Sequence, residues 1–421
     1  RRQRADETLP VPPLETFQNQ LEGTGEREVS TTMAFVRILA ALLRDKELGP
    51  RIVPIIPDET RTFGMEGMFR QLGIYSHVGQ LYEPEDANQL MFYREDRKGQ
   101  VLQEGITEAG AMSSWIAAAT SYSNHNVQMI PFFIFYSMFG FQRIGDLAWA
   151  AGDSRARGFL IGGPSGRTTL NGEGLQHEDG HSHVLSQTIP NCVSYDPAYA
   201  YELAVIIREG LRRMVGEQED VFYYLTVMNE NYRHPPMPEG AEEGILKGMH
   251  RVREADGAKV RLLGSGTILR EVEAAADLLA QDFDIPAEVW SVTSYTELRR
   301  EGLAIEREAR LHPDAERRTP WVEKCLGGST APVVAASDYM KAMPDGIRAW
   351  VPGRFEVLGT DGYGRSDYRR HLRRFFEVDR HHVVVAALHA LAKEGEVDVA
   401  AVKEAIAKYD IDPDAPDPVT V

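Results

Sequence analysis

The chain has 421 residues, of which 43% are hydrophobic and 26% are charged, a composition typical of a globular protein with two or three domains. Its formal net charge of −17 argues against a general nucleic-acid-binding protein, because no broad basic face would neutralise phosphates. The most apolar run, residues 127–141, is too short to cross a bilayer and contains Pro131 and Gly140, so a membrane partner is not expected either.

The beginning of the chain has the composition of a connecting segment. Residues 1–7 are polar, with no initiating methionine and no apolar core of a signal peptide, and residues 9–13 are rich in proline. We therefore expect the chain to begin inside a longer protein and residues 1–28 to form a linker. Two distant cysteines, Cys192 and Cys325, are too few for a disulfide framework and favour a cytoplasmic protein.

Residues 29–235 alternate between helix-like and strand-like segments. Apolar residues at helical spacing predict helices over 33–43 and 107–119. Short apolar runs predict strands over 51–56, 129–136, 159–163, 192–195 and 221–227. Asp196 and Pro197 are typical of a helix start, with the aspartate as N-cap. Strands that alternate with helices predict a parallel sheet covered on both faces.

A proline-rich stretch over residues 233–244 predicts a domain boundary. Beyond it the same alternation recurs, with strands expected over 260–263, 289–292, 332–336 and 356–359. Helices are expected from about 267 to 279 and over 386–393 and 399–408. The sequence thus predicts an α/β protein with two tandem domains, 29–235 and 245–421, each a mainly parallel sheet flanked by helices.

Two features of the first region lie where α/β proteins place ligands. Glu108 begins a helix of small residues, although a carboxylate is also common there because it favours the positive helix end. Aromatic residues are dense over 135–141, directly after a predicted strand. Such residues are often core, but loops beyond the carboxyl ends of parallel strands bind ligands, and aromatic faces suit a flat heterocycle. The pattern alone leaves both interpretations open.

Residues 162–183 contain six glycines and three histidines, which indicates an ordered functional loop. His177, His181 and His183 with Glu178 could bind zinc or manganese, although their spacing matches no helical histidine pair. A phosphate cradle is also conceivable, but the terminal Gly-Lys-Ser/Thr of a P-loop is absent. Residues 264–267, Gly-Ser-Gly-Thr, match a dinucleotide fingerprint only superficially, and a tight turn is the better interpretation.

Four segments together resemble the homodimeric bacterial pyruvate dehydrogenases of the acetyl-transferring kind: 104–112, 136–143, 166–183 and 359–367. The resemblance extends from about Val29 to the last helices. This family belongs with the transketolase-like thiamine diphosphate enzymes, whose subunits carry a diphosphate-binding, a pyrimidine-binding and a C-terminal domain. The chain resembles the last two, with the pyrimidine-binding domain over 29–235 and the C-terminal domain over 245–421.

The family's diphosphate-binding motif, Gly-Asp-Gly followed by an asparagine, does not occur in the sequence. The resemblance therefore implies that thiamine diphosphate and Mg²⁺ are anchored by a domain missing from this chain. It also implies that the chain alone binds the cofactor poorly and is inactive.

The resemblance assigns the cofactor ring to three residues. Glu108 would hydrogen-bond the pyrimidine nitrogen N1′ and favour the imino tautomer, whose 4′ nitrogen accepts the thiazolium C2 proton. Burial would raise the pKa of Glu108 and the helix N-terminus would lower it, and sequence does not decide between them. Phe139 would lie against the pyrimidine, and Tyr136 would face the reacting centre.

Four further residues receive roles from the same resemblance. His177 would hydrogen-bond the pyruvate-derived group, and Glu173 and Glu59 would be secondary acidic residues of the pocket. Arg143 matches a position linked to an acidic tunnel between two active sites, with its partner carboxylates expected in the missing domain. No residue is assigned as a resident metal ligand. His181 and His183 are expected only to order the loop.

The implied reaction is decarboxylation of pyruvate and transfer of the acetyl group to a lipoyl group of dihydrolipoamide acetyltransferase, by a homodimer. Two other classes stay open on the residues alone. One is a metal-dependent hydrolase that uses the loop from His177 to His183. The other is a non-catalytic dimerisation module.

Overall fold

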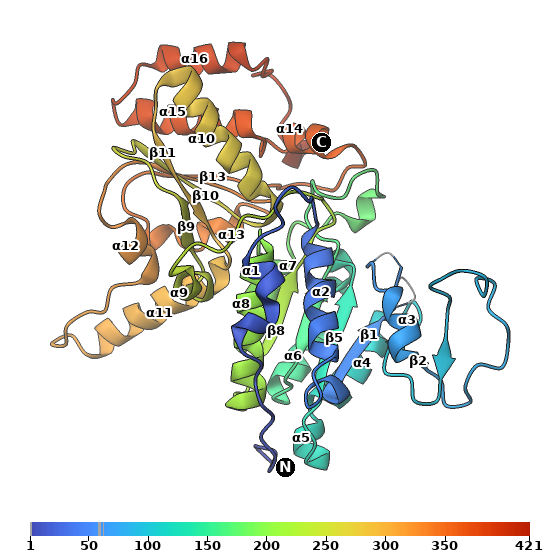
Figure 1. The fold of residues 1–421 in the computed structure, drawn as a ribbon. Helices are drawn as coiled ribbons and strands as arrows, with labels where there is room; N and C mark the ends of the chain where they lie inside the picture. The colour runs from blue at the N-terminus through green and yellow to red at the C-terminus, as the bar shows by residue number, and fades with distance from the viewer. Residues whose placement is uncertain (1, 58–59, 62) are drawn as a thin grey trace. The chain divides into compact units, whose positions relative to one another are not determined.

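The computed structural model describes residues 2–57, 60–61 and 63–421, so the predicted site residue Glu59 lies outside the described residues. The described chain forms two compact units (Figure 1). The first unit comprises the chain up to residue 165 with residues 185–193 and 199–237. The second unit comprises residues 166–184, 194–198 and 238–421, so the glycine- and histidine-rich loop packs with the C-terminal part of the chain.

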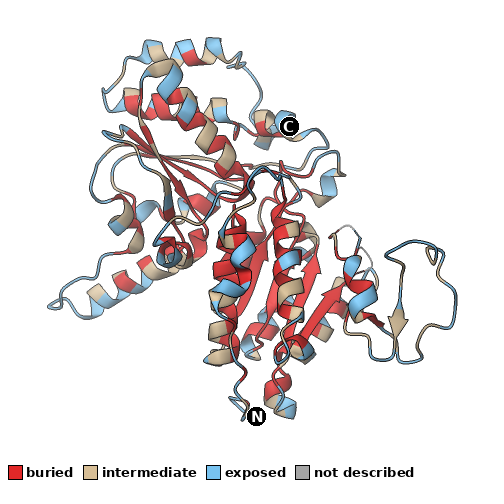
Figure 2. Ribbon diagram, in the orientation of Figure 1, coloured by how far each residue is buried: buried red, intermediate tan, exposed pale blue. Residues whose placement is uncertain are grey.

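In the described part of the first unit, six strands form one sheet in the order β4-β1-β5-β6-β8-β7. The strands are β1 (Ile52–Ile56), β4 (Leu102–Gln103), β5 (Ile130–Phe135), β6 (Phe159–Gly162), β7 (Cys192–Tyr195) and β8 (Phe222–Thr226). The pairs β4–β1, β1–β5, β5–β6 and β6–β8 are parallel. Every residue of β1, β5, β6 and β8 is buried, as expected where helices cover a parallel sheet (Figure 2).

The main helices of this unit are α2 (Thr31–Leu43), α4 (Glu108–Ala119), α6 (Phe141–Asp153) and α8 (Ala200–Leu211). Ser30 is the N-cap of α2, and its side chain accepts a hydrogen bond from the amide of Met33. Helix α4 packs on α6, β1 and β5, and α2 packs on α8. Trp115 of α4 is fully buried in the core beneath α4 and α6. These contacts hold the start of α4 beside the chain that follows β5.

Smaller elements complete the first unit. Residues 63–105 contribute α3 (Gly67–Leu72) and a small parallel pair, β2 (Ile74–Tyr75) and β3 (Glu95–Asp96). The segment 2–28, which its composition predicts to be a linker, contains a short 3-10 helix, η1 (Leu14–Phe17), and α1 (Gln18–Leu21). Phe17 is fully buried, and the amide of Ala5 donates to the side chain of Gln218 across 2.8 Å, so this segment packs on the unit.

In the described second unit, five strands form a sheet in the order β13-β12-β10-β11-β9. They are β9 (His250–Arg253), β10 (Val260–Gly264), β11 (Ala287–Ser291), β12 (Val333–Ala336) and β13 (Phe355–Leu358). All pairs are parallel except the edge pair β11–β9, which is antiparallel. The covering helices include α10 (Leu269–Phe283), α11 (Tyr295–Leu311), α12 (Trp321–Leu326), α14 (Arg369–Phe375), α15 (Arg380–Lys393) and α16 (Val399–Lys408).

The predicted α/β fold with mainly parallel sheets is confirmed, while one local prediction is wrong. Asp196 does not cap a helix, because α8 begins at Ala200 after Tyr199. Backbone hydrogen bonds hold Asp196 elsewhere, since its amide donates to Thr293 across 2.8 Å and its carbonyl accepts from Gly266 across 3.1 Å. The helix therefore does not start at Asp196, because hydrogen bonds to distant residues, which local sequence does not reveal, hold that residue.

The turn over residues 264–267 joins β10 to α10, and it leaves very little space between the strand and the helix. A side chain at Gly264 would meet the Cα atom of Leu269 at 2.7 Å, and Gly266 has a positive φ of 49°. Gly264 thus allows the close packing of strand on helix and Gly266 the positive φ of the turn, as the tight-turn interpretation predicts.

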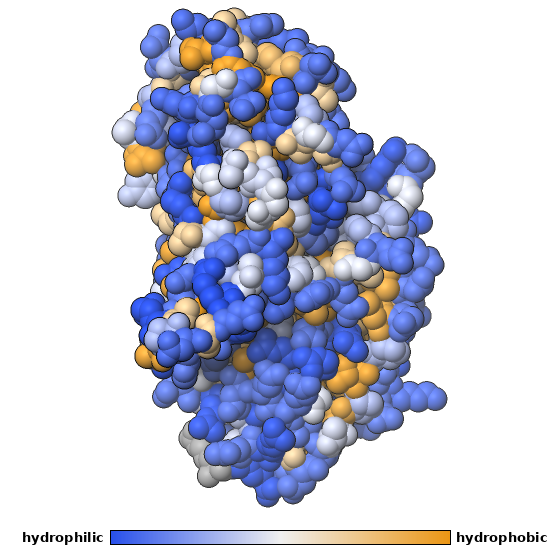
Figure 3. Space-filling model, turned by 90° about the vertical axis from the view of Figure 1, so that its left-hand side faces the viewer, coloured by the Kyte–Doolittle hydropathy of each residue, from blue (hydrophilic) through white to orange (hydrophobic). Residues whose placement is uncertain are grey.

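No helix within the described ranges is long and apolar enough to span a bilayer. The face seen in Figure 3 is mostly hydrophilic, and the apolar residues on it form separate patches.

Candidate active site

Glu108 is the first residue of α4, and local sequence explains its position. Thr107 is the N-cap of the helix, and its side-chain oxygen accepts a hydrogen bond from the amide of Gly110 across 3.2 Å. This cap fixes where the helix begins and places a carboxylate in its first turn. The Glu108 side chain is only 13% exposed. It is therefore held at the edge of the first unit's core, out of bulk water.

The partner of Glu108 comes from α6. Nη1 of Arg143 donates to Oε1 of Glu108 across 2.9 Å. The Arg143 guanidinium also lies over the ring of Phe139, 4.0 Å from its centroid. Glu108 is thus the ion-pair partner of Arg143 in this unit, and the expectation of further carboxylate partners in the missing domain stays a prediction.

The aromatic residues after β5 form a continuous group with this ion pair. The rings of Tyr136 and Phe139 meet edge to face with centroids 6.2 Å apart. Phe63, which follows β1, also packs on Tyr136, with ring centroids 5.6 Å apart. Both β1 and β5 end at the same edge of the parallel sheet, which brings these chain segments together. We call Glu108, Tyr136, Phe139 and Arg143 the Glu108 cluster.

Sequence reasoning missed Phe63. Its side chain is 1% exposed and belongs to the surroundings of Tyr136. It lies in an irregular segment without hydrophobic periodicity, so the one available signal was its position after the carboxyl end of β1.

In the second unit, His177 ends a short 3-10 helix, η4 (Leu175–His177). Its Nδ1 atom is 3.3 Å from Oε2 of Glu173, so the two predicted site residues of this loop are neighbours. His177 is 22% exposed and Glu173 is 37% exposed. A hydrogen bond to a carboxylate orients a histidine through one ring nitrogen.

The other two histidines of the loop have separate surroundings. His183 lies in α7 (Ser182–Ser186), is buried, and packs edge to face on the ring of Tyr339 at 4.8 Å. Burial lowers the pKa of His183 to about 4, against the opposing charge of Asp179, so this imidazole is neutral at pH 7. The amides of His181 and Ser182 both donate to Asp179 across 2.9 Å. Within residues 2–57, 60–61 and 63–421, no group of three or more histidine, cysteine or acidic side chains is arranged to hold a metal ion.

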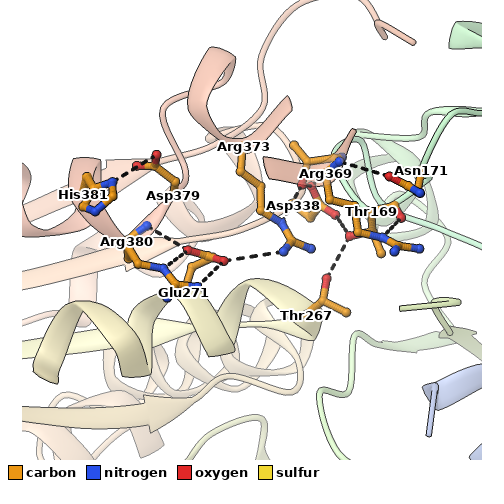
Figure 4. A network of polar contacts seen from close by, with 11 residues as sticks. Thr169, Asn171, Thr267, Glu271, Asp338, Arg369, Arg373, Asp379, Arg380 and His381 are labelled. Carbon is orange, nitrogen blue, oxygen red and sulfur yellow. Dashed lines mark hydrogen bonds and ion pairs between the residues drawn. The ribbon is translucent and has the colours of Figure 1, made fainter. Parts of the chain in front are cut away.

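The start of the loop is fastened to Asp338, which follows β12. Oδ1 of Asp338 accepts from the amide of Thr168 at 2.8 Å and from its hydroxyl at 2.7 Å, and Oδ2 accepts from the hydroxyl of Thr169 at 2.5 Å. Burial raises the pKa of Asp338, and the charge of Arg373 opposes this effect. Thr169 also hydrogen-bonds Thr267 at 2.8 Å, which ties the loop to the turn before α10 (Figure 4).

A second acidic residue continues this network. Glu271 of α10 accepts from Nε of Arg380 at 2.8 Å and lies 3.5 Å from Arg373 (Figure 4). Burial alone would raise the pKa of Glu271, but the hydrogen bonds and charge of Arg380 hold it below its ordinary value. This network supports the segment on which the loop packs.

Comparison with known proteins identifies both parts of the chain. Residues 9–235 match the family model of the pyruvate dehydrogenase E1 component middle domain. Residues 248–379 match the transketolase-like TK C-terminal domain. Among solved structures, a transketolase from Leishmania mexicana superposes with a TM-score of 0.67 at 16% identity, covering 91% of this chain and 48% of that chain. A split-gene transketolase described as an inactive beta4 tetramer superposes with a TM-score of 0.56 at 17% identity, covering 86% of this chain and 98% of that chain.

Two curated relatives are much closer in sequence. The pyruvate dehydrogenase E1 component of Pseudomonas aeruginosa is 69% identical over 416 residues, which are 98% of this chain and 47% of the relative. That of Escherichia coli K12 is 59% identical, with the same coverage of 98% and 47%. The chain spans about half the length of these relatives. Because the middle-domain model alone matches more than half of its residues, the chain belongs to the pyruvate dehydrogenase E1 component family.

Proposed function

We propose that the chain supplies the pyrimidine-binding and C-terminal portions of an enzyme that decarboxylates pyruvate with thiamine diphosphate. The acetyl group would then pass to a lipoyl group on dihydrolipoamide acetyltransferase. The observation that carries the proposal is the Glu108 cluster: a sheltered carboxylate at a helix start, paired with Arg143 and adjoining the rings of Phe139 and Tyr136. The family membership of the chain supports the same reading.

The chemistry of the Glu108 cluster fits an aminopyrimidine. A carboxyl group can share a hydrogen bond with a ring nitrogen, and aromatic side chains pack well against a flat heterocycle. When bound, thiamine diphosphate supplies the electron sink for the carbanion that forms as pyruvate loses carbon dioxide. Phe139 and Tyr136 would provide the apolar surface for the ring, and Glu108 would hold the proton at N1′.

Arg143 has a role that follows from its two contacts. Its hydrogen bond to Oε1 limits the rotation of the Glu108 carboxyl group, and its stacking on Phe139 limits its own movement. The second carboxyl oxygen of Glu108 can then face the heterocycle. Arg143 would thus act by orienting the carboxyl group that moves the proton.

His177 and Glu173 are proposed to act on the substrate. The His177 imidazole, whose Nδ1 atom lies 3.3 Å from Glu173, would hydrogen-bond the hydroxyl or carboxylate of the pyruvate-derived group. Glu173 would set the tautomer and orientation of the imidazole, as carboxylates do for histidines in many sites. Glu59 is proposed as a further acidic residue of the pocket.

The chain spans about half the length of its relatives, and the other half enters the proposal as well. We assign the diphosphate and its Mg²⁺ to the other half of the relatives' length, so this chain alone should bind the cofactor weakly. The working enzyme is proposed to be a cytoplasmic homodimer. The boundaries proposed for its two domains are 29–235 and 245–421, preceded by a connecting segment over 1–28.

The test is pyruvate decarboxylation by this chain joined to the half that its relatives carry in addition. Glu108→Ala should remove at least 99% of the turnover while the dimer stays intact. The matched control is Glu297→Ala, because Glu297 also lies in the first turn of a helix and pairs with an arginine, Arg300, at 2.8 Å. Turnover near that of the unaltered enzyme in Glu108→Ala would refute the proposal, as would an equal loss in the control.

A further inference from the structure

We propose that Glu178 is a positioning residue for His177, acting through its hydrogen bond to the backbone of residues 362–369, and this inference rests on the proposed role of His177. We call residues 362–369 the anchor segment. Glu178 follows His177 directly, its side chain is fully buried, and it has no part in the mechanism described so far.

The Glu178 side chain contacts the backbone of the anchor segment. Oε2 of Glu178 accepts a hydrogen bond from the amide of Arg365 across 2.6 Å. The amide of Glu178 donates to Leu175 across 3.2 Å, and that of His177 donates to Gly174 across 2.9 Å, which closes the turn that carries the imidazole. The Glu178 side chain therefore ties the end of this turn to the anchor segment. Because Glu178 follows His177 directly, this hydrogen bond limits how far the turn that carries the imidazole can move.

The anchor segment follows the loop along its length. The hydroxyl of Ser366 donates to the carbonyl of Glu173 across 2.6 Å, and the amide of Gly172 donates to Asp367 across 3.2 Å. Nε of Arg369 donates to the carbonyl of Thr169 across 2.6 Å. The anchor segment thus holds the loop on both sides of His177, and Glu178 supplies the side-chain contact closest to it.

The anchor segment and the loop leave little space between them. A Cβ atom at Gly364 would lie 2.4 Å from the carbonyl oxygen of Leu175 and 3.0 Å from both the Cβ and Oε2 atoms of Glu178. Real side-chain atoms do not come this close, so the approach of the anchor segment requires glycine here. A second change, Gly364→Ala, can therefore disturb the same contact from the opposite side.

The buried surroundings of Glu178 favour its protonated form. Burial raises the pKa of Glu178 to about 8, with Asp338 adding to this effect and the Arg365 amide and Arg167 opposing it. Among the described residues, no hydrogen-bond partner reaches its Oε1 atom. The carboxyl group thus carries a proton at pH 7 and serves as a neutral acceptor. A glutamine at this position should replace it, whereas an alanine should not.

The decisive experiment is a double-mutant cycle in the joined, full-length enzyme at pH 7. We expect Glu178→Ala to lower kcat for pyruvate decarboxylation about tenfold with KM changed less than threefold, and Glu178→Gln to stay within twofold of the unaltered enzyme. In a His177→Ala background, Glu178→Ala should cause no further loss, because the residue acts through the imidazole. Losses that multiply in the double variant would overturn the inference while leaving the proposed function intact.

Two further measurements distinguish a loss of His177 positioning from a general loss of stability. Val289→Ala, in the buried centre of β11, should lower the melting temperature of the unit and leave kcat at 25 °C unchanged. Amide hydrogen exchange over residues 173–178 should accelerate in Glu178→Ala and in Gly364→Ala, but not in Glu178→Gln or Val289→Ala. This readout needs no activity, so unchanged exchange in Glu178→Ala would overturn the inference even if the proposed function failed its own test.

Discussion

Arg143 places its guanidinium between the Glu108 carboxylate, 2.9 Å away, and the ring of Phe139, 4.0 Å from its centroid. One side chain thereby links the acid at the start of α4 to the aromatic residues after β5. Two segments that are distant in sequence become one chemical group. The orientation of the Glu108 carboxyl group consequently depends on a residue of a different helix.

This link predicts the effect of changing Arg143. Arg143→Ala should lower kcat/KM for pyruvate about fivefold to tenfold, because the Glu108 carboxyl group loses the hydrogen bond that orients it, a contribution of about 1 kcal/mol for a half-exposed pair. Arg143→Lys should recover only part of the loss, since lysine keeps the charge but cannot stack on Phe139 in the same way. Steady-state kinetics of the joined enzyme measure both, and full activity in Arg143→Ala would contradict the orienting role.

The buried carboxyl group of Glu178 predicts a dependence of stability on pH. Its pKa is about 8 in the folded chain and near 4.5 when unfolded, so the stabilisation by its proton is complete below about pH 4.5 and is lost as the pH rises towards 8. Glu178→Gln has no proton to lose. Its melting temperature should therefore rise relative to the unaltered chain by about 2 °C or more between pH 5 and pH 8. A difference that stays constant across this range would contradict the raised pKa.

For His183 we expect the opposite dependence of stability on pH. Its pKa falls to about 4 in the folded chain from the ordinary 6.5, so its contribution is complete above pH 6.5 and is lost as the pH falls towards 4. Thermal unfolding of the unaltered chain and of His183→Gln should be compared between pH 7 and pH 4.5. The unaltered chain should lose at least about 2 °C more than the variant over this range. An equal loss in both proteins would show that His183 is not the titrating group.

We expect that the loss of a single tryptophan from the core beneath α4 strongly lowers the free energy of unfolding. Trp115 is fully buried, its indole donates to the carbonyl of Phe159 across 3.0 Å, and it packs edge to face on Phe222 at 5.7 Å. Trp115→Ala should lower the free energy of unfolding by about 3–5 kcal/mol. Trp149, which is 53% exposed, offers the matched control, and Trp149→Ala should cost less than about 1 kcal/mol. Denaturant titrations of both variants make the comparison.

Hydrophobic periodicity predicted much of the fold. The helices α2 and α4 and the buried strands β5, β6 and β8 agree with their predicted segments to within one or two residues. Helix α11 was missed because it is densely charged and buries only a sparse stripe that includes Leu298 and Ile305. The edge strand β9 was also missed, since only its first residue, His250, is buried and the strand lacks an apolar run.

The candidate site could be predicted in part for a similar reason. Glu108, Tyr136 and Phe139 come together because the carboxyl ends of parallel strands share one edge, which is a rule that sequence can apply. The pairing of Arg143 with Glu108 depends on how α6 is rotated against α4, and the attachment of Glu178 to Arg365 depends on a contact across 187 residues. Neither rotation nor long-range contact is encoded in a local pattern.

The central claim is that the Glu108 carboxyl group promotes loss of the C2 proton of bound thiamine diphosphate. The most direct test measures the exchange of that proton with deuterium oxide in the joined enzyme at saturating cofactor and Mg²⁺. Glu108→Ala should slow the exchange at least about 100-fold, the scale of general acid–base catalysis, with the cofactor still bound. Exchange within threefold of that in the unaltered enzyme would contradict the account.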